Sequence, residues 1–177
     1  HFGREKWSQA GSLVVGVSGS WLGGCLFWGW LRAHPVLHLP VEAIALPLAC
    51  VGLGTRWRIG SGFYLACLVG TAFTDLMMVL TGVMNTWPEI VQAPIQKAPE
   101  LLNETAQMLL HPQPIALLVC AGALIVLVAR LMRERAALGS PLSSTWLVAS
   151  AALITTLWID GLFLLSALIQ PRLSGLI

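Results

Sequence analysis

The spacing of the charged residues is the feature that most constrains how this chain can fold. No charged residue lies between Lys6 and Arg32 or between Glu104 and Arg130. Three further stretches contain one acidic residue each, namely Arg32 to Arg56 with Glu42, Arg58 to Glu89 with Asp75, and Arg135 to Arg172 with Asp160. A helix needs about 20 mostly apolar residues to cross about 30 Å of hydrocarbon. We therefore predict five transmembrane helices, over residues 9–31, 38–55, 60–85, 113–133 and 145–169.

The composition agrees with a membrane protein and excludes two other classes. Of the 177 residues, 56% are hydrophobic and only 10% are charged, whereas a soluble domain carries about 25% charged residues. The net charge is +2, and the basic residues are scattered among apolar stretches. This pattern lacks the clustered basic surface that nucleic-acid binding requires. The predicted fold is an all-α polytopic bundle, one membrane domain over residues 1–177, with the lipid bilayer as a partner.

Two segments are expected to depart from simple spanning helices. The second span is short and contains Pro40 and Pro47, so we expect it to be kinked. Between the third and fourth spans, residues 86–112 form a polar, proline-rich outer loop. Within that loop, the segment from Ala98 to Leu110 has a proline at its start and leucines at helical spacing. This pattern predicts a short amphipathic helix on the outer surface, and an irregular loop is the alternative.

The distribution of basic residues predicts the orientation. Short loops rich in Lys and Arg are retained on the cytoplasmic side. With the N-terminus inside, the inner side holds Arg4, Lys6, Arg56, Arg58, Arg130, Arg133 and Arg135, and the outer side holds Arg32, Lys97 and Arg172. We therefore expect an integral membrane protein whose N-terminus is cytoplasmic and whose C-terminus lies on the opposite side.

Asp75 and Asp160 are the strongest functional signal, because each lies well inside a predicted span. An unpaired carboxylate there costs about 2.5–3.5 kcal/mol on insertion scales. The two side chains could bind a coupling proton or cation. Alternatively, each hydrogen-bonds a neighbouring helix and stabilises the bundle through Thr71, Thr74, Thr155 or Thr156. Glu42 lies near the outer end of the second span, from which its side chain can also reach the headgroups.

A weak internal repeat relates the two halves of the chain. The segment Ile44 to Cys50 resembles Ile115 to Ala121, and Thr71 to Asp75 resembles Thr156 to Asp160, in the same order. Spans two and three would then correspond to spans four and five, with both pairs running in the same direction. Parallel repeats occur in transporters, while chance similarity between apolar segments is the alternative.

His34 and His38 flank Pro35 between the first two spans. Their four-residue separation would align them on a helix, where neutral imidazole could bind a metal or the magnesium of a chlorophyll. The local prolines argue against a regular helix, and an interfacial structural role is the alternative. His34, His38 and Glu42 could also form an outer enzymatic site. The chain has no G-x-S-x-G, H-E-x-x-H or P-loop motif, however, so we do not expect an enzyme.

Two further groups of residues predict contacts with another helix or with a partner. Gly16, Gly19 and Gly23 form a stripe of small residues in the first span, which allows another helix to approach closely. That helix could belong to this chain or to another subunit. Arg130, Arg133 and Arg135 extend the fourth span into the cytoplasmic side, where they could contact a partner.

The segment His34-Pro-Val-Leu-His-Leu-Pro-Val-Glu-Ala-Ile-Ala-Leu-Pro-Leu-Ala49, followed by Arg56-Trp-Arg58 and the Asp75 segment, supports a family resemblance. It resembles an uncharacterised family of small multi-spanning cyanobacterial integral membrane proteins. The resemblance implies an oxygenic phototroph and a thylakoid or plasma membrane. The family has no assigned catalytic residues, so none can be transferred.

Two hypotheses about function follow. In the first, the chain is a non-catalytic accessory or assembly subunit of a larger membrane complex, a photosynthetic one by the resemblance, with other membrane-protein subunits as partners. Chlorophyll, carotenoid or bound lipid are then the candidate cofactors. In the second, it is a small proton- or ion-coupled transporter or solute-binding membrane component that uses Asp75 and Asp160.

Overall fold

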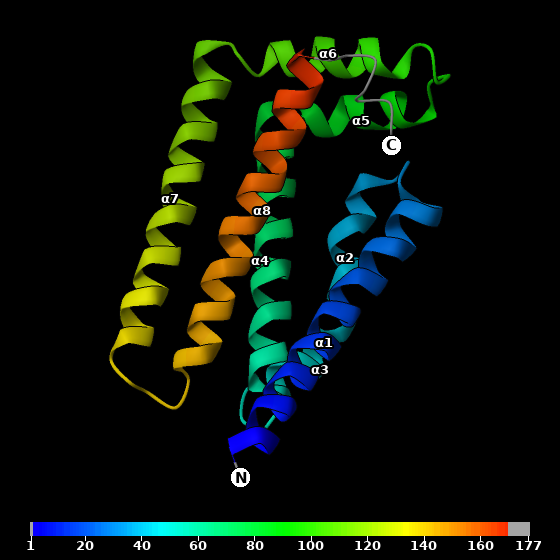
Figure 1. The fold of residues 1–177 in the computed structure, drawn as a ribbon. Helices are drawn as coiled ribbons and strands as arrows, with labels where there is room; N and C mark the ends of the chain where they lie inside the picture. Colours follow the sequence, from blue (N-terminus) through cyan, green and yellow to red (C-terminus); the bar gives the residue numbers. More distant parts are fainter. Residues whose placement is uncertain (1, 170–177) are drawn as a thin grey trace.

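A computed structural model describes residues 2–169, which form helices and connecting loops without any strand (Figure 1). Five segments are long and apolar enough to cross a membrane, namely Glu5–Leu31, Pro35–Gly52, Arg58–Thr81, Pro112–Ala137 and Ser143–Ile169. These segments confirm the all-helical fold with five candidate spans. They indicate an integral membrane protein in a lipid environment.

The first two spans contain most of the irregular helix. α1 (Phe2–Leu26) continues as a π-helical turn, η1 (Phe27–Leu31). The second span is built from four short pieces in series: η2 (Pro35–Leu37), α2 (His38–Glu42), η3 (Ala43–Ala45) and α3 (Leu46–Gly52). Prolines in η2, α2 and α3 cannot donate helical hydrogen bonds, which accounts for the breaks. The second span is therefore short and irregular, as the sequence predicts.

The central helix of the bundle is α4 (Arg58–Thr81). It packs on α1 and α3 at one side and on α8 (Ser143–Ile169) at the other, and α7 (Pro112–Ala137) packs on α8 (Figure 1). α4 and α8 run in the same direction along the bundle. Side chains on the outer faces, such as Leu48, Val51 and Trp158, are large, apolar and at least 66% exposed, which suits contact with lipid.

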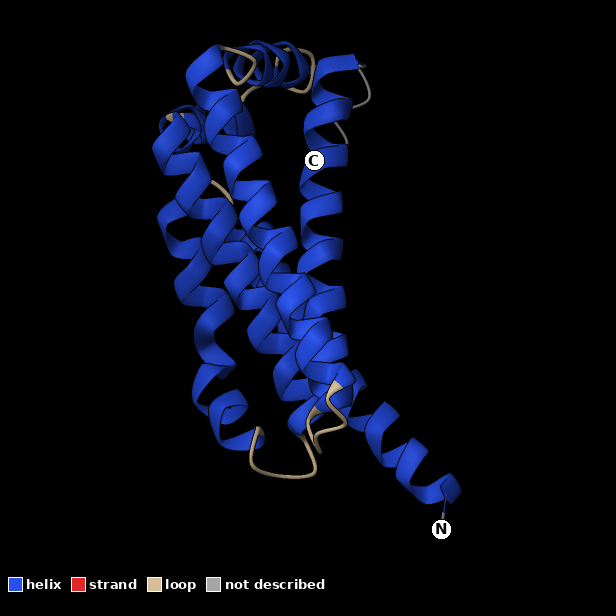
Figure 2. Ribbon diagram, turned by 90° about the vertical axis from the view of Figure 1, so that its left-hand side faces the viewer, coloured by secondary structure: helices blue, strands red, loops and turns tan. Residues whose placement is uncertain are grey.

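Two helices lie across the end of the bundle, α5 (Val83–Gln92) and α6 (Ala98–Met108), and Figure 2 shows α6 almost end-on. α6 is the amphipathic helix that the sequence predicts. α5 was not predicted, because the third span was expected to continue to residue 85. The chain turns instead at Gly82, whose φ of 82° lies in the left-handed region that glycine adopts most readily.

An apolar cluster attaches these two helices to the bundle. Trp87 and Ile90 of α5 pack with Leu102 and Ala106 of α6 and with Ala167 of α8. The Asn103 amide donates a hydrogen bond of 2.7 Å to the Ala167 carbonyl, which satisfies a carbonyl in the last turn of α8.

The glycine stripe of α1 packs inside the chain. A Cβ atom on Gly16 would lie 2.3 Å from the carbonyl oxygen of Gly60, on α4. Gly19 faces the Tyr64 ring at 3.7 Å, and Gly23 faces Glu42. Of the two partners that the sequence left open for the stripe, the structure therefore shows the one within this chain.

The predicted inner basic residues lie toward one end of the bundle, opposite α5 and α6 (Figure 1). Arg130, Arg133 and Arg135 are exposed near the end of α7, and Arg130 forms an ion pair with Glu134 at 3.2 Å. Arg172 and the C-terminus, which were part of the orientation prediction, lie outside the described residues.

The contact between α1 and α4 predicts a strong effect of adding one methyl group. A Cβ atom on Gly60 would lie 1.9 Å from the carbonyl oxygen of Ser12, so Gly60→Ala forces two backbones apart. We expect a loss of about 1–3 kcal/mol in the free energy of unfolding, measured by SDS titration with circular dichroism.

Gly161→Ala is the matched control, because a Cβ atom on this glycine of α8 meets no atom within 4 Å. It should leave stability unchanged or raise it by about 0.5–1 kcal/mol. Equal effects of the two substitutions would contradict the close contact between α1 and α4.

Candidate intramembrane ionisable site

His38 lies between two carboxylates, in the half of the bundle nearer α5 and α6. Its Nδ1 is hydrogen-bonded to Oδ1 of Asp75 at 3.0 Å, and its Nε2 lies 3.3 Å from Oε1 of Glu42. The three side chains are 20%, 15% and 13% exposed, for His38, Asp75 and Glu42 respectively. α2 brings His38 and Glu42 together because they are four residues apart on one helical face. We call these three residues the Glu42–His38–Asp75 triad.

The hydrogen bond of His38 to Asp75 and its close contact with Glu42 limit how many protons the triad holds. When both ring nitrogens bond to carboxylate oxygens, each bond needs one proton. Either an imidazolium donates to both carboxylates, or a neutral imidazole donates to one carboxylate and accepts from the protonated other. The triad carries one net negative charge in both arrangements. A proton can therefore change its position along the triad without a change in total charge.

Residues of α4 hold Glu42 in place. The Thr71 hydroxyl donates a hydrogen bond of 2.7 Å to Oε2 of Glu42. The Tyr64 hydroxyl donates to the Glu42 backbone carbonyl and accepts a hydrogen bond of 3.2 Å from the Ala45 backbone N–H. Tyr64, Thr71 and Asp75 are seven and four residues apart, so they share one face of α4. That face orients the irregular second span.

Asp160 of α8 lies beside the triad. Its Oδ2 accepts a hydrogen bond of 2.6 Å from the hydroxyl of Thr74, the residue before Asp75. The helices approach closely here, because a Cβ atom on Gly70 would lie 3.0 Å from the Thr156 side chain. The threonine bond expected for an intramembrane aspartate is therefore present at Asp160. Asp75 is bonded to His38, a partner that the sequence did not indicate.

The two aspartates lie at the same level of the bundle. Asp75 follows Arg58, the first residue of α4, by 17 residues, and Asp160 follows Ser143, the first residue of α8, by the same number. At about 1.5 Å per residue, each lies about 26 Å from the start of its helix. Both carboxylates are therefore nearer the end covered by α5 and α6. Their equal depth is the geometry that the proposed repeat requires.

The two histidines near the start of the second span have different environments. His34 is exposed and has a non-helical backbone, with φ of −120° and ψ of 72°. It does not share a helical face with His38, whose i,i+4 partner is Glu42. Over the part of the chain that the structure describes, no group of three or more His, Cys, Asp or Glu side chains is arranged to hold a metal ion.

An aromatic side chain that the sequence analysis did not single out completes the site. Phe27 of η1 is 2% exposed, and its ring stacks on the His38 imidazole with a centroid distance of 4.2 Å. Its place in the sequence could have indicated a buried contact, because Phe27 follows Gly23 by four residues and continues the face of the glycine stripe.

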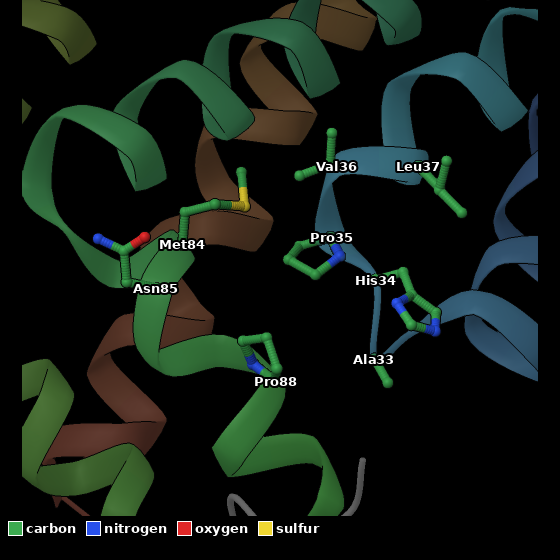
Figure 3. Close-up of a pocket in the computed structure, with 8 residues that line it drawn as sticks. All are labelled: Ala33, His34, Pro35, Val36, Leu37, Met84, Asn85 and Pro88. Atoms are coloured by element: carbon green, nitrogen blue, oxygen red, sulfur yellow. The ribbon is translucent and has the colours of Figure 1, made fainter.

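A pocket of about 460 Å³ lies next to the triad, between η2 and α5. Figure 3 shows Pro35, Met84 and Pro88 facing one another across this pocket, with His34 and Asn85 at its border. None of its eight lining residues is Asp, Glu, Lys or Arg. The pocket is joined to the triad through the backbone, because the His38 N–H donates a hydrogen bond to the Pro35 carbonyl.

Comparison with known proteins assigns the chain to a family. Residues 1–168 match the family described as "Protein of unknown function (DUF3120)", and the chain belongs to that family. The resemblance to an uncharacterised family is thereby confirmed. Neither the curated proteins nor the solved structures contain a match to the chain.

The bond between His38 and Asp75 should be measurable as a coupling energy. We expect a double-mutant cycle with His38→Gln and Asp75→Asn to give about 1–2 kcal/mol in SDS unfolding. This exceeds the average of about 0.6 kcal/mol for hydrogen bonds between membrane helices, because the bond joins ionisable groups. The control cycle pairs His34→Gln with Asp75→Asn and should give no coupling. The same coupling in both cycles would contradict the triad.

Proposed function

We propose that this protein is a small proton-coupled membrane carrier and that the Glu42–His38–Asp75 triad, with Asp160, moves the coupling proton. The observation that supports this proposal best is the position of the His38 imidazole between two carboxylates, with Nδ1 hydrogen-bonded to Asp75 and Nε2 3.3 Å from Glu42. Chains of Asp, Glu and His within a membrane are the groups from which proton relays are built.

The chemistry of the relay follows from the two ring nitrogens. Imidazole can accept a proton at one nitrogen and release another from the second nitrogen. For His38, these two nitrogens face Glu42 on its own helix and Asp75 on α4. A proton that leaves Glu42 can thus be matched by a proton that arrives at Asp75. Before the transfer can repeat, the imidazole protons or the ring itself must return to the starting arrangement.

The excess negative charge of the site favours the binding of protons. Three carboxylates, those of Glu42, Asp75 and Asp160, accompany a single imidazole. Even with His38 protonated and all three carboxylates ionised, the group has a net charge of −2. Excess charge is costly where the dielectric constant is low. Binding of a proton reduces that charge, which links the protonation of the site to the energy of the bundle.

The pocket beside η2 offers a place for a transported solute. Its lining lacks charged side chains, so it suits a small neutral molecule better than an ion. Its lining includes two polar residues, His34 and Asn85. In addition, Pro88 of α5 has no N–H to donate to the Met84 carbonyl. The Pro35–His38 backbone bond would transmit solute binding to the triad.

The flux assay tests the proposal directly. In proteoliposomes with a membrane potential and an internal pH-sensitive dye, the wild type should take up protons faster than empty vesicles. We expect Asp75→Asn and Asp160→Asn each to lower that rate at least tenfold. An amide can still form a hydrogen bond, but it does not take up and release a proton near neutral pH.

Glu89→Gln is the control, since it removes an exposed carboxylate of α5 outside the site. Unfolding by SDS shows whether each variant is folded. Unchanged flux in both aspartate variants, or a wild type no faster than empty vesicles, would contradict the proposal.

A second candidate function is the non-catalytic accessory or assembly subunit, and the exposed arginines of α7 support it. Arg133 and Arg135 lie at the end of a spanning helix, where a partner could reach them. With the resemblance to cyanobacterial proteins, the partner would be a photosynthetic complex of the thylakoid or plasma membrane, with the N-terminus cytoplasmic. Exposed His34 is then the candidate ligand for chlorophyll, and carotenoid or bound lipid could cover the exposed apolar side chains of the helices.

Extraction of native membranes in mild detergent distinguishes the two candidates. An accessory subunit should be recovered in a large particle, together with pigment or lipid, and Arg133→Ala with Arg135→Ala should release it. The Arg56→Ala variant, which changes a basic residue in the loop before α4, serves as the control. Recovery of the chain only as a small free species would contradict the accessory role.

A further inference from the structure

The end of the first span has an unusual backbone. α1 ends at Leu26, and the next five residues form the π-helical turn η1, which begins with Phe27. π-helical turns are rare and occur frequently at functional sites. This turn lies at the level of His38, and its first side chain is the ring that stacks on the imidazole.

The stacking geometry restrains the His38 ring. The two rings are inclined by 29° with centroids 4.2 Å apart, and Phe27 is 2% exposed. A half-turn of the imidazole about its Cβ–Cγ bond would take both nitrogens away from the carboxylates, and the ring would have to leave the stack on the way. The aromatic face also attracts positive charge, so it suits the imidazolium that a relay passes through.

Phe27 also contacts a second aromatic ring. Its ring meets Trp28 edge to face at 5.7 Å, and Trp28 meets Trp87 of α5 in the same way at 6.0 Å. The Trp87 indole N–H donates a hydrogen bond of 3.2 Å to the Arg32 carbonyl. A continuous series of rings therefore joins α5 to His38, with Phe27 in contact with the imidazole.

Gly23 places the backbone of α1 against the same element. A Cβ atom there would lie 3.0 Å from Cα of Glu42, so a larger residue would press on the α2 backbone. The α1 backbone at Gly23 and the Phe27 ring one helical turn later together form a wall along α2. Glu42 packs on the first part of this wall and His38 on the second.

We infer that Phe27 is a positioning residue, which holds the His38 imidazole in the orientation where one nitrogen faces Asp75 and the other faces Glu42. Its effect on transport rests on the proposed proton relay. Its effect on the His38 ring can be measured without any transport.

The test compares Phe27→Leu with Trp30→Leu in the full-length protein. Trp30 belongs to the same π-helical turn but is 77% exposed, so its replacement leaves the stack intact. NMR with labelled histidine reports the ring, and the His38 signals are those that disappear in His38→Gln. We expect Phe27→Leu to remove the ring-current shift of the His38 protons and to alter both ring-nitrogen signals. Proton flux should fall at least tenfold, while Trp30→Leu resembles the wild type.

The outcomes separate this inference from the proposed function. If wild-type flux depends on Asp75 but Phe27→Leu changes neither flux nor the His38 nitrogen signals, the positioning role is wrong and the relay stands. If the wild type shows no flux but Phe27→Leu changes the nitrogen signals, the positioning role is supported and the relay is wrong. Phe27→Met, with a flexible side chain that adapts to irregular space, replaces the leucine variant if that variant does not fold.

Discussion

The cost of holding ionisable side chains away from water governs this structure. Glu42, Asp75 and Asp160 each lie inside a spanning segment, and each is bonded to a group from another element of the bundle. Because lipid supplies no hydrogen bonds, these partners must come from the protein itself. The need to satisfy three carboxylates therefore draws α2, α4 and α8 together at one level, near the end that α5 and α6 cover.

Close backbone contact makes that meeting possible. The glycines of α1 let it lie directly on α4 and α2, and Gly70 of α4 lets α8 approach at the level of Thr74. Small residues serve the same purpose in many membrane bundles, since dispersion and short polar contacts replace the hydrophobic effect there. The irregular second span belongs to this arrangement as well. Its breaks bring His38 and Glu42 to the α4 face that carries Tyr64, Thr71 and Asp75.

The composition of the site supports the proposed role in proton transfer over a purely structural one. Neutral hydrogen bonds are enough to hold helices together. The Ser12 hydroxyl, for example, donates to the Trp57 carbonyl and accepts from the Gly60 N–H. The triad uses three groups that exchange protons, and it lies beside a third carboxylate, that of Asp160, and near a pocket lined without Asp, Glu, Lys or Arg. Burial of such groups is expensive, so their presence in one place favours a role that depends on protonation.

The sequence alone was sufficient to predict the five spans, the broken second span and the surface helix, because charge spacing, proline and amphipathic periodicity act locally. It also identified the acidic residues by their cost in lipid. It did not predict α5, where the left-handed turn at Gly82 decides the path, nor the pairing of His38 with Asp75 or the contact of Phe27. Those depend on which helix faces come together, and only the packing of the whole bundle determines that.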